Sequence, residues 1–135
     1  MEQVVIYAKY IFAVVGTAIL SLIGGWDMAL QVLVIMVVID YVTGMTAAWL
    51  TGELSSSVGF KGITKKILLF IPVVIGVCID NVLGQEILRS LAIMFYIANE
   101  GLSILENLGR SGVPIPEPVR KALAALKESS EKGYE

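Results

Sequence analysis

The sequence predicts an all-α integral membrane protein with about four transmembrane helices and a short C-terminal cytoplasmic amphipathic helix. Of its 135 residues, 56% are hydrophobic and 16% are charged, and the mean hydropathy is +0.80. Soluble domains carry about 25% charged residues. The hydrophobic residues are gathered into long blocks, and a block of about 20 residues can cross a bilayer as a helix. These features favour a membrane protein over a soluble one.

Four such blocks are expected to form a transmembrane helical bundle over residues 1–108. No cleavage site of the Ala-x-Ala type follows the first block, so it is interpreted as a retained span and not as a secretory signal. The second block has one formally charged residue, Asp40. The third block is near the short limit for a span, and the fourth is the least apolar. The expected spans are residues 4–23, 28–50, 67–83 and 87–105.

Polar segments are expected to connect and follow these spans. Residues 24–27 predict a tight turn, and residues 54–66 predict a polar loop rich in serine and glycine. Residues 109–135 are expected to hold a Pro-rich spacer, an amphipathic helix and a tail, because three prolines between positions 114 and 118 favour an extended chain. The apolar face of this amphipathic helix consists of Val119, Ala122, Leu123 and Leu126.

The distribution of cations predicts the orientation. With four spans, nine of the ten Lys and Arg residues lie on one side of the membrane, and only Arg89 lies on the other. A three-span arrangement would separate the cations of the tail from the lysines of residues 54–66. Because cytoplasmic segments of membrane proteins are enriched in Lys and Arg, both termini are expected to be cytoplasmic.

The composition argues against several classes of function. The chain has no histidine and a single cysteine, Cys78, so no Cys/His metal site, disulfide framework or His-dependent catalytic arrangement is expected. The net charge of −2, without a basic face, gives no indication of nucleic-acid binding. We therefore expect no catalytic residue, no metal and no cofactor, and we expect the protein not to be an enzyme.

The polar residues inside the apolar blocks are the candidates for function. A charge in mid-bilayer costs about 2.5–3.5 kcal/mol on insertion scales, so such a residue needs a partner or water. No cation in the chain is expected to reach Asp40 at depth. Asp40 is therefore expected to be protonated, to bond to Thr43, Ser21 or Asn99, or to face a water-filled lumen between copies. Asp80 could equally lie at the outer interface of the membrane instead of inside it. The candidate assembly or lumen residues are Asp40, Thr43, Gly44, Ala48, Asp80, Asn99 and Glu100.

Several motifs follow one another over roughly residues 32–126, and their order and spacing are more specific than any motif alone. They are Asp40-Tyr41-Val42-Thr43-Gly44, the loop motif Ser55, Ser56, Gly59, Gly62, Lys65 and Lys66, and residues 99–107 and 112–116. With these motifs, the sequence resembles the bacteriophage holin family that includes the clostridial toxin-secretion and phage-lysis holins.

The resemblance implies a protein that accumulates in the bacterial (host) inner membrane. It also implies that copies assemble as a homo-oligomer into pores, or lesions, that release endolysin or, in toxin loci, a secreted toxin, so that the host cell is lysed. No active site is implied. Two alternatives stay open. One is a small four-span cation-coupled transporter or ion channel that binds a cation at Asp40 or Glu100. The other is an antiholin-type regulator that delays lysis.

Overall fold

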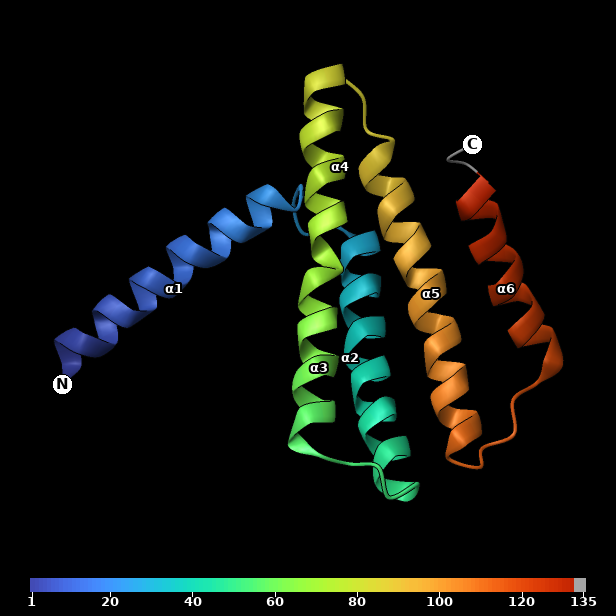
Figure 1. The fold of residues 1–135 in the computed structure, drawn as a ribbon. Helices are drawn as coiled ribbons and strands as arrows, with labels where there is room; N and C mark the ends of the chain where they lie inside the picture. The colour runs from blue at the N-terminus through green and yellow to red at the C-terminus, as the bar shows by residue number, and fades with distance from the viewer. Residues whose placement is uncertain (133–135) are drawn as a thin grey trace.

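The computed structural model describes residues 1–132, apart from the side chains of Leu126, Lys127, Ser130 and Glu131. The described chain is built of α-helices, which confirms the predicted all-α class (Figure 1). The helices are α1 (Glu2–Leu22), α2 (Met28–Leu50), α3 (Ser56–Leu68), α4 (Phe70–Leu83), α5 (Leu88–Arg110) and α6 (Glu117–Lys132).

Four helical segments in the described chain are long and apolar enough to cross a membrane. They are α1, α2, the stretch Ser56–Leu83 that joins α3 to α4, and α5. The number of membrane-length helices agrees with the sequence prediction. Each is 21 residues or longer, which exceeds the roughly 20 residues that a 30 Å hydrocarbon core requires.

The prediction of a polar loop over residues 54–66 is wrong, because α3 begins at Ser56. The side chain of Ser55 accepts a hydrogen bond from the backbone N–H of Val58 at 3.1 Å, and this N-cap starts the helix. Gly59 and Gly62 are not turn residues. Both face α2, where a Cβ at Gly62 would lie 3.3 Å from the ring of Tyr41. The glycines therefore allow α3 to approach α2 closely.

The long α3–α4 segment is interrupted at Leu69, and Pro72 explains the position of the break. Proline has no backbone N–H, and its ring clashes with the carbonyl group four residues earlier, which belongs to Leu68. The last turn of α3 and the first turn of α4 thus meet at Leu69 without separating, and Leu69 itself is buried in the core.

The hydrophobic core lies where α2, α4 and α5 meet. In Figure 1, α5 runs alongside both α2 and α4, and it packs against each of them. Apolar side chains from these helices contact one another there and fill the centre of the bundle. The buried cluster consists of Leu33, Val37, Leu69, Val73, Ala92 and Ile93.

Helix α1 stands apart from this bundle. It has no buried residue, and Figure 1 shows that it extends away from the other helices. It joins α2 through Gly24 and Gly25, whose φ angles of +87° and +98° are accessible to glycine and rarely to other residues. The predicted turn at residues 24–27 is therefore present, and its geometry requires the two glycines.

Helix α6 turns back and lies along α5 (Figure 1). Leu123 contacts α5 at Gly101, where a Cβ would lie 3.2 Å from its methyl groups. The predicted amphipathic helix is thus present and packs on a neighbouring helix of the same chain. The predicted contribution of Leu126 to its apolar face lies outside the described side chains, and residues 133–135 of the predicted tail lie outside the described residues.

Candidate functional site

Three charged side chains from three helices meet inside the bundle. The ammonium group of Lys66 on α3 contacts the carboxylate of Asp40 on α2 and lies 2.5 Å from Oε2 of Glu100 on α5. Asp40 and Glu100 are 4% and 3% exposed. We call Asp40, Lys66 and Glu100 the ion cluster. It links three of the four membrane-length helices.

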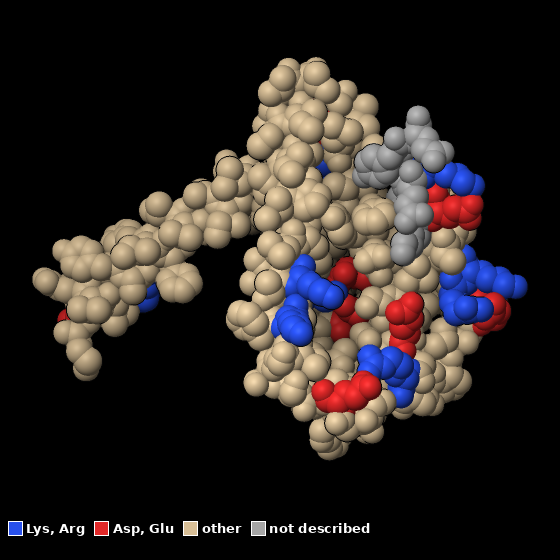
Figure 2. Space-filling view, in the orientation of Figure 1, with Lys and Arg blue, Asp and Glu red and all other residues tan. Residues whose placement is uncertain are grey.

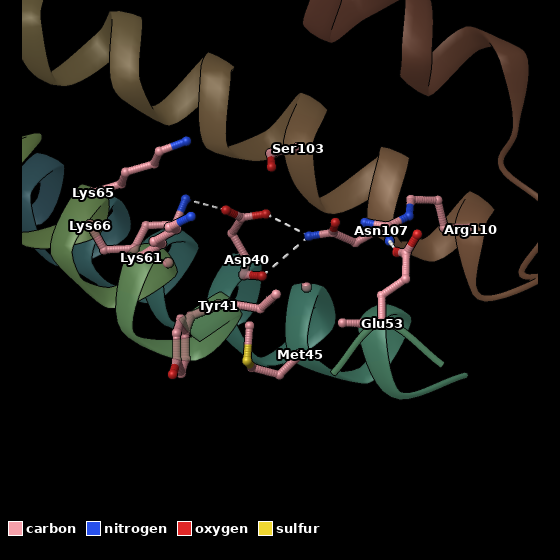
Figure 3. A pocket seen from close by; sticks show the side chains of 14 residues that line it. Asp40, Tyr41, Met45, Glu53, Lys61, Lys65, Lys66, Ser103, Asn107 and Arg110 are labelled. Carbon is pink, nitrogen blue, oxygen red and sulfur yellow. Dashed lines mark hydrogen bonds and ion pairs between the residues drawn. The ribbon is translucent and has the colours of Figure 1, made fainter. Parts of the chain in front are cut away.

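Asn107 of α5 completes the coordination of Asp40. Its amide nitrogen donates to Oδ1 of Asp40 at 2.8 Å and to the backbone carbonyl of Asp40 at 3.2 Å. The same nitrogen lies 3.2 Å from the hydroxyl oxygen of Thr43, whose own O–H donates to the carbonyl of Ile39. Gly44 lies beside this amide, and a Cβ there would be in van der Waals contact with the nitrogen at 3.4 Å. Figure 3 shows Asp40 between Lys66 and Asn107.

A hollow of about 550 Å³ opens beside the ion cluster, between α2, α3 and α5. In Figure 3, the three lysines of α3 lie on one side of this hollow, and Arg110 with Glu53 lies on the other. Arg110 donates to Oε2 of Glu53 at 2.7 Å. In Figure 2, cationic and acidic side chains gather over this end of the bundle, whereas the visible surface of α1 is almost free of them.

The ion cluster carries two carboxylates and one ammonium group. An unpaired buried charge costs several kcal/mol, so each carboxylate depends on Lys66 and on the neighbouring donors. Within the described residues, no buried side-chain nitrogen or oxygen lacks a hydrogen-bond partner. The buried polar side chains of the described bundle are therefore satisfied inside a single chain.

This arrangement corrects the expectation that no cation reaches Asp40 at depth. That expectation placed Lys66 in a loop, whereas the helical conformation of residues 56–68 brings its ammonium group to α2 and α5. Of the possibilities given for Asp40, a water-filled lumen between copies is not needed, because its carboxylate has partners within its own chain. A serine that can act as an N-cap is a sequence signal for the start of a helix, and it could have placed Lys66 in a helix and not in a loop.

The structure brings some of the predicted residues together and separates others. Thr43 and Gly44 adjoin the ion cluster, and Ala48 lines the hollow. Asn99 is partly exposed and does not line the hollow. Of the loop motif, Ser55 caps α3, Ser56 begins it, Gly59 and Gly62 face α2, and Lys65 lines the hollow beside Lys66.

Asn107 is a site residue that was not among those predicted from the sequence. It lies seven positions after Glu100, which places both side chains on one face of a helix, with Ser103 between them. All three side chains face the region of the ion cluster and the hollow. The spacing of these three polar residues in an apolar segment was therefore an available signal.

A second polar cluster lies at the opposite end of the bundle and involves Asp80. This carboxylate is 4% exposed and accepts hydrogen bonds from the backbone N–H groups of Leu88 and Arg89 at 3.0 and 2.9 Å. It therefore caps the start of α5. Gly76 lies one turn earlier, where a Cβ would be 2.9 Å from the backbone nitrogen of Arg89. Gly84 ends α4 in the left-handed conformation, with φ at +66°.

The side chain of Arg89 ties this end to the α1–α2 turn. Its guanidinium donates to the carbonyls of Ile23 and Gly25 at 2.6 and 3.2 Å and to Oδ2 of Asp27 at 2.6 Å. The hydrogen bond from Arg89 is the main reason that the pKa of Asp27 is lowered from its usual value. Asp27 also caps α2 by accepting from Leu30 at 2.9 Å. The contacts of Asp80 and Arg89 are structural, since each partner is a helix end or a turn.

The contacts of the two clusters join helices and turns to one another. Within the described residues, no group of three or more His, Cys, Asp or Glu side chains is placed to hold a metal ion. The ion cluster instead has the chemistry of a helix-to-helix connection, in which one cation neutralises acids on two neighbouring helices. Four membrane-length helices, three of them joined by such a cluster, define a multi-pass helical membrane protein.

Comparison with known proteins identifies the family. The model of the bacteriophage holin family matches residues 17–128, so the chain belongs to that family. The chain is 35% identical to a probable holin of Bacillus phage phi105 over 107 residues, which are 78% of this chain and 79% of that protein. The predicted resemblance is confirmed.

Some bacterial relatives match over a larger share of the chain. An uncharacterized protein of Halalkalibacterium halodurans is 41% identical over 92% of this chain and 96% of its own length. An uncharacterized 14.9 kDa protein in the nagH 3′ region of Clostridium perfringens is 40% identical over 93% of this chain and 97% of its own length. No solved structure matches this chain.

Proposed function

We propose that this protein is a holin that accumulates in the bacterial cytoplasmic membrane and assembles there into lesions that release endolysin or a toxin. The observation that carries the proposal is the holin-family match over residues 17–128, which includes both polar clusters and three of the four membrane-length helices in full. The probable holin of Bacillus phage phi105 supports the same role. The protein acts on the membrane and not as an enzyme.

The features of α1 support the oligomeric part of the proposal. All of its side chains are available to lipid or to neighbouring copies, because none is buried in the chain itself. Small residues at Ala13, Thr17 and Ser21 repeat at every fourth position, and such stripes allow helices to approach closely in lipid. We place the contact between copies on α1 and not on Asp40, because the latter is satisfied within its own chain.

The distribution of cations supports an orientation with both termini in the cytoplasm. Residues 1–108 form the transmembrane domain in this proposal, and residues 109–135 form the cytoplasmic segment. The lysines of α3 and the cations of residues 110–132 then lie on the cytoplasmic side, as the bias of Lys and Arg toward that side requires.

The test is complementation of a phage that lacks its own holin gene and keeps its endolysin. Supplying this chain should restore sudden lysis and plaque formation, whereas the same gene with its start codon removed should not. Two other outcomes would contradict the proposal. If the phage without a holin still fails to lyse, the result would point to the transporter or channel alternative. If the chain is supplied to a phage with an intact holin and lysis is delayed, the result would point to an antiholin.

The contacts in the folded chain support the cation-transport alternative less well than the sequence alone does. A transporter that binds a cation at Asp40 or Glu100 needs those carboxylates to be available. In the folded chain, both already contact the ammonium group of Lys66. A transported cation would have to displace an internal ion pair.

A further inference from the structure

We propose that the hollow between α2, α3 and α5 binds the phosphate headgroup of an anionic phospholipid. The proposal goes beyond lysis and concerns how a single chain is seated in its membrane. It rests on the charge balance of the lining, on the position of the unpaired cations and on the apolar part of the walls.

The lining has a surplus of cations. Lys66 is occupied by Asp40 and Glu100, and Arg110 is occupied by Glu53. Among the residues that the structure describes, Lys61 and Lys65 form no ion pair, although both line the hollow. Two ammonium groups are thus free to bind an anion.

The two free cations are arranged on one side of the entrance. Lys61 and Lys65 are four residues apart on α3, so they lie on the same face of the helix one turn apart. Both side chains are exposed. Across the hollow lie Arg110 and Glu53, close to the ends of α5 and α2. The hollow therefore extends from the level of these helix ends, where lipid headgroups are found, along α3 to the ion cluster.

The walls suit a lipid better than a soluble anion. Met45, Ala48 and Val58 give the hollow an apolar side next to the cations. The volume of about 550 Å³ also exceeds what a phosphate group alone fills. Basic pockets between transmembrane helices on the cytoplasmic side are suited to anionic headgroups such as cardiolipin. In this arrangement the phosphate contacts the lysines, and the glycerol and upper acyl chain lie against the apolar side. The lipid thus matches both the charged and the apolar part of the lining.

The experiment is native mass spectrometry of the full-length protein in detergent, titrated separately with phosphatidylglycerol, phosphatidylcholine and inorganic phosphate. The test variant is Lys61→Gln/Lys65→Gln. The matched control is Lys9→Gln/Lys121→Gln, which removes the same charge from two exposed lysines outside the hollow. A Lys61→Arg/Lys65→Arg variant keeps the charge and checks that side-chain replacement at these positions leaves the fold intact.

The wild type should bind phosphatidylglycerol in preference to phosphatidylcholine. The Lys61→Gln/Lys65→Gln variant should lose at least about tenfold in affinity for phosphatidylglycerol, since each cation near an anionic lipid contributes measurably to binding. The control and the arginine variant should retain it. Equal loss in test and control variants would overturn the proposal, as would equal binding of the two lipids. Displacement of the lipid by stoichiometric inorganic phosphate would show a site for free anions and would also overturn it.

Discussion

The ammonium group of Lys66 lies 2.5 Å from the carboxylate of Glu100 and contacts the carboxylate of Asp40 at the same time. One cation near the end of α3 therefore connects α2 to α5. Both acids are buried, so each of them depends on this contact in a medium of low dielectric constant. The relationship makes Lys66 the residue whose loss the bundle should tolerate least.

Replacement of Lys66 by methionine should destabilise the bundle strongly. The free energy of unfolding should fall by about 3–5 kcal/mol, because two buried carboxylates lose their cation. Unfolding in detergent, followed by circular dichroism, measures this change. The neighbouring Lys65→Met removes an exposed lysine with no ion pair in the described structure, and it should change stability by less than about 0.5 kcal/mol. Equal effects of the two variants would contradict the account.

Replacement of Glu100 by glutamine should cost much less than replacement of Lys66. The amide keeps an oxygen that accepts from Lys66, and the cluster then holds one carboxylate for one ammonium group. We expect a loss of no more than about 1 kcal/mol, the usual value of one hydrogen bond. Glu106→Gln, at an exposed position of the same helix, is the control and should be neutral. A loss for Glu100→Gln as large as that for Lys66→Met would show that the acids, and not the cation, limit stability.

Replacement of Gly76 by alanine should destabilise the contact between α4 and α5. The new Cβ would lie 2.9 Å from the backbone nitrogen of Arg89, and this backbone has to move. Overpacking of this kind costs about 1–3 kcal/mol. Gly16→Ala in α1 meets no atom within 4 Å and should leave stability unchanged or raise it slightly. Thermal unfolding of the two purified variants gives the comparison, and a harmless Gly76→Ala would argue against the close approach.

The pair formed by Asp27 and Arg89 should give a pH dependence at the acid end. The hydrogen bond from Arg89 lowers the pKa of Asp27, so the pair stabilises the folded state above the unfolded value of about 4. This stabilisation is lost as the pH falls through the lower pKa of the folded state. It should stay below about 1 kcal/mol, because Asp27 is 50% exposed.

Comparison with Asp27→Asn isolates this contribution, since asparagine also caps a helix well. The wild type should be the more stable of the two at pH 6, and the difference should shrink as the pH is lowered below about 4. Unfolding curves at several pH values measure it. A difference that grows toward low pH would contradict the assigned direction.

The all-α class and the number of membrane-length helices could be predicted from the long apolar blocks. In lipid, the backbone of such a block must satisfy its hydrogen bonds internally, and a helix does so. Met28–Leu50 was predicted with the bounds that the structure gives. The start of α3 could not be found by the same reasoning, because its polar serines and its two glycines are typical of a loop. Their actual roles, a helix cap and a close contact with α2, depend on the neighbouring helix.

The candidate site was predicted in part. Asp40 and Glu100 were identified because buried acids are costly in a membrane, and this cost does not depend on the fold. Their shared partner depends on the fold, since Lys66 reaches them only when residues 56–68 are helical. Asp80 was predicted as an assembly or lumen candidate, and the structure shows it accepting from the backbone of α5 inside one chain. That contact depends on the turn that brings the start of α5 back to the end of α4, and the periodicity of apolar residues does not predict the path of this turn.

The membrane potential of growing bacteria tests the proposed holin function most directly. This chain would be expressed from an inducible promoter, with and without a phage endolysin, while a potential-sensitive dye and the culture density are recorded. Our account predicts normal growth during accumulation, then abrupt loss of potential, with rapid lysis only when endolysin is present. Continued growth with an intact potential at high expression would contradict it. So would a slow decline that depends on an added substrate.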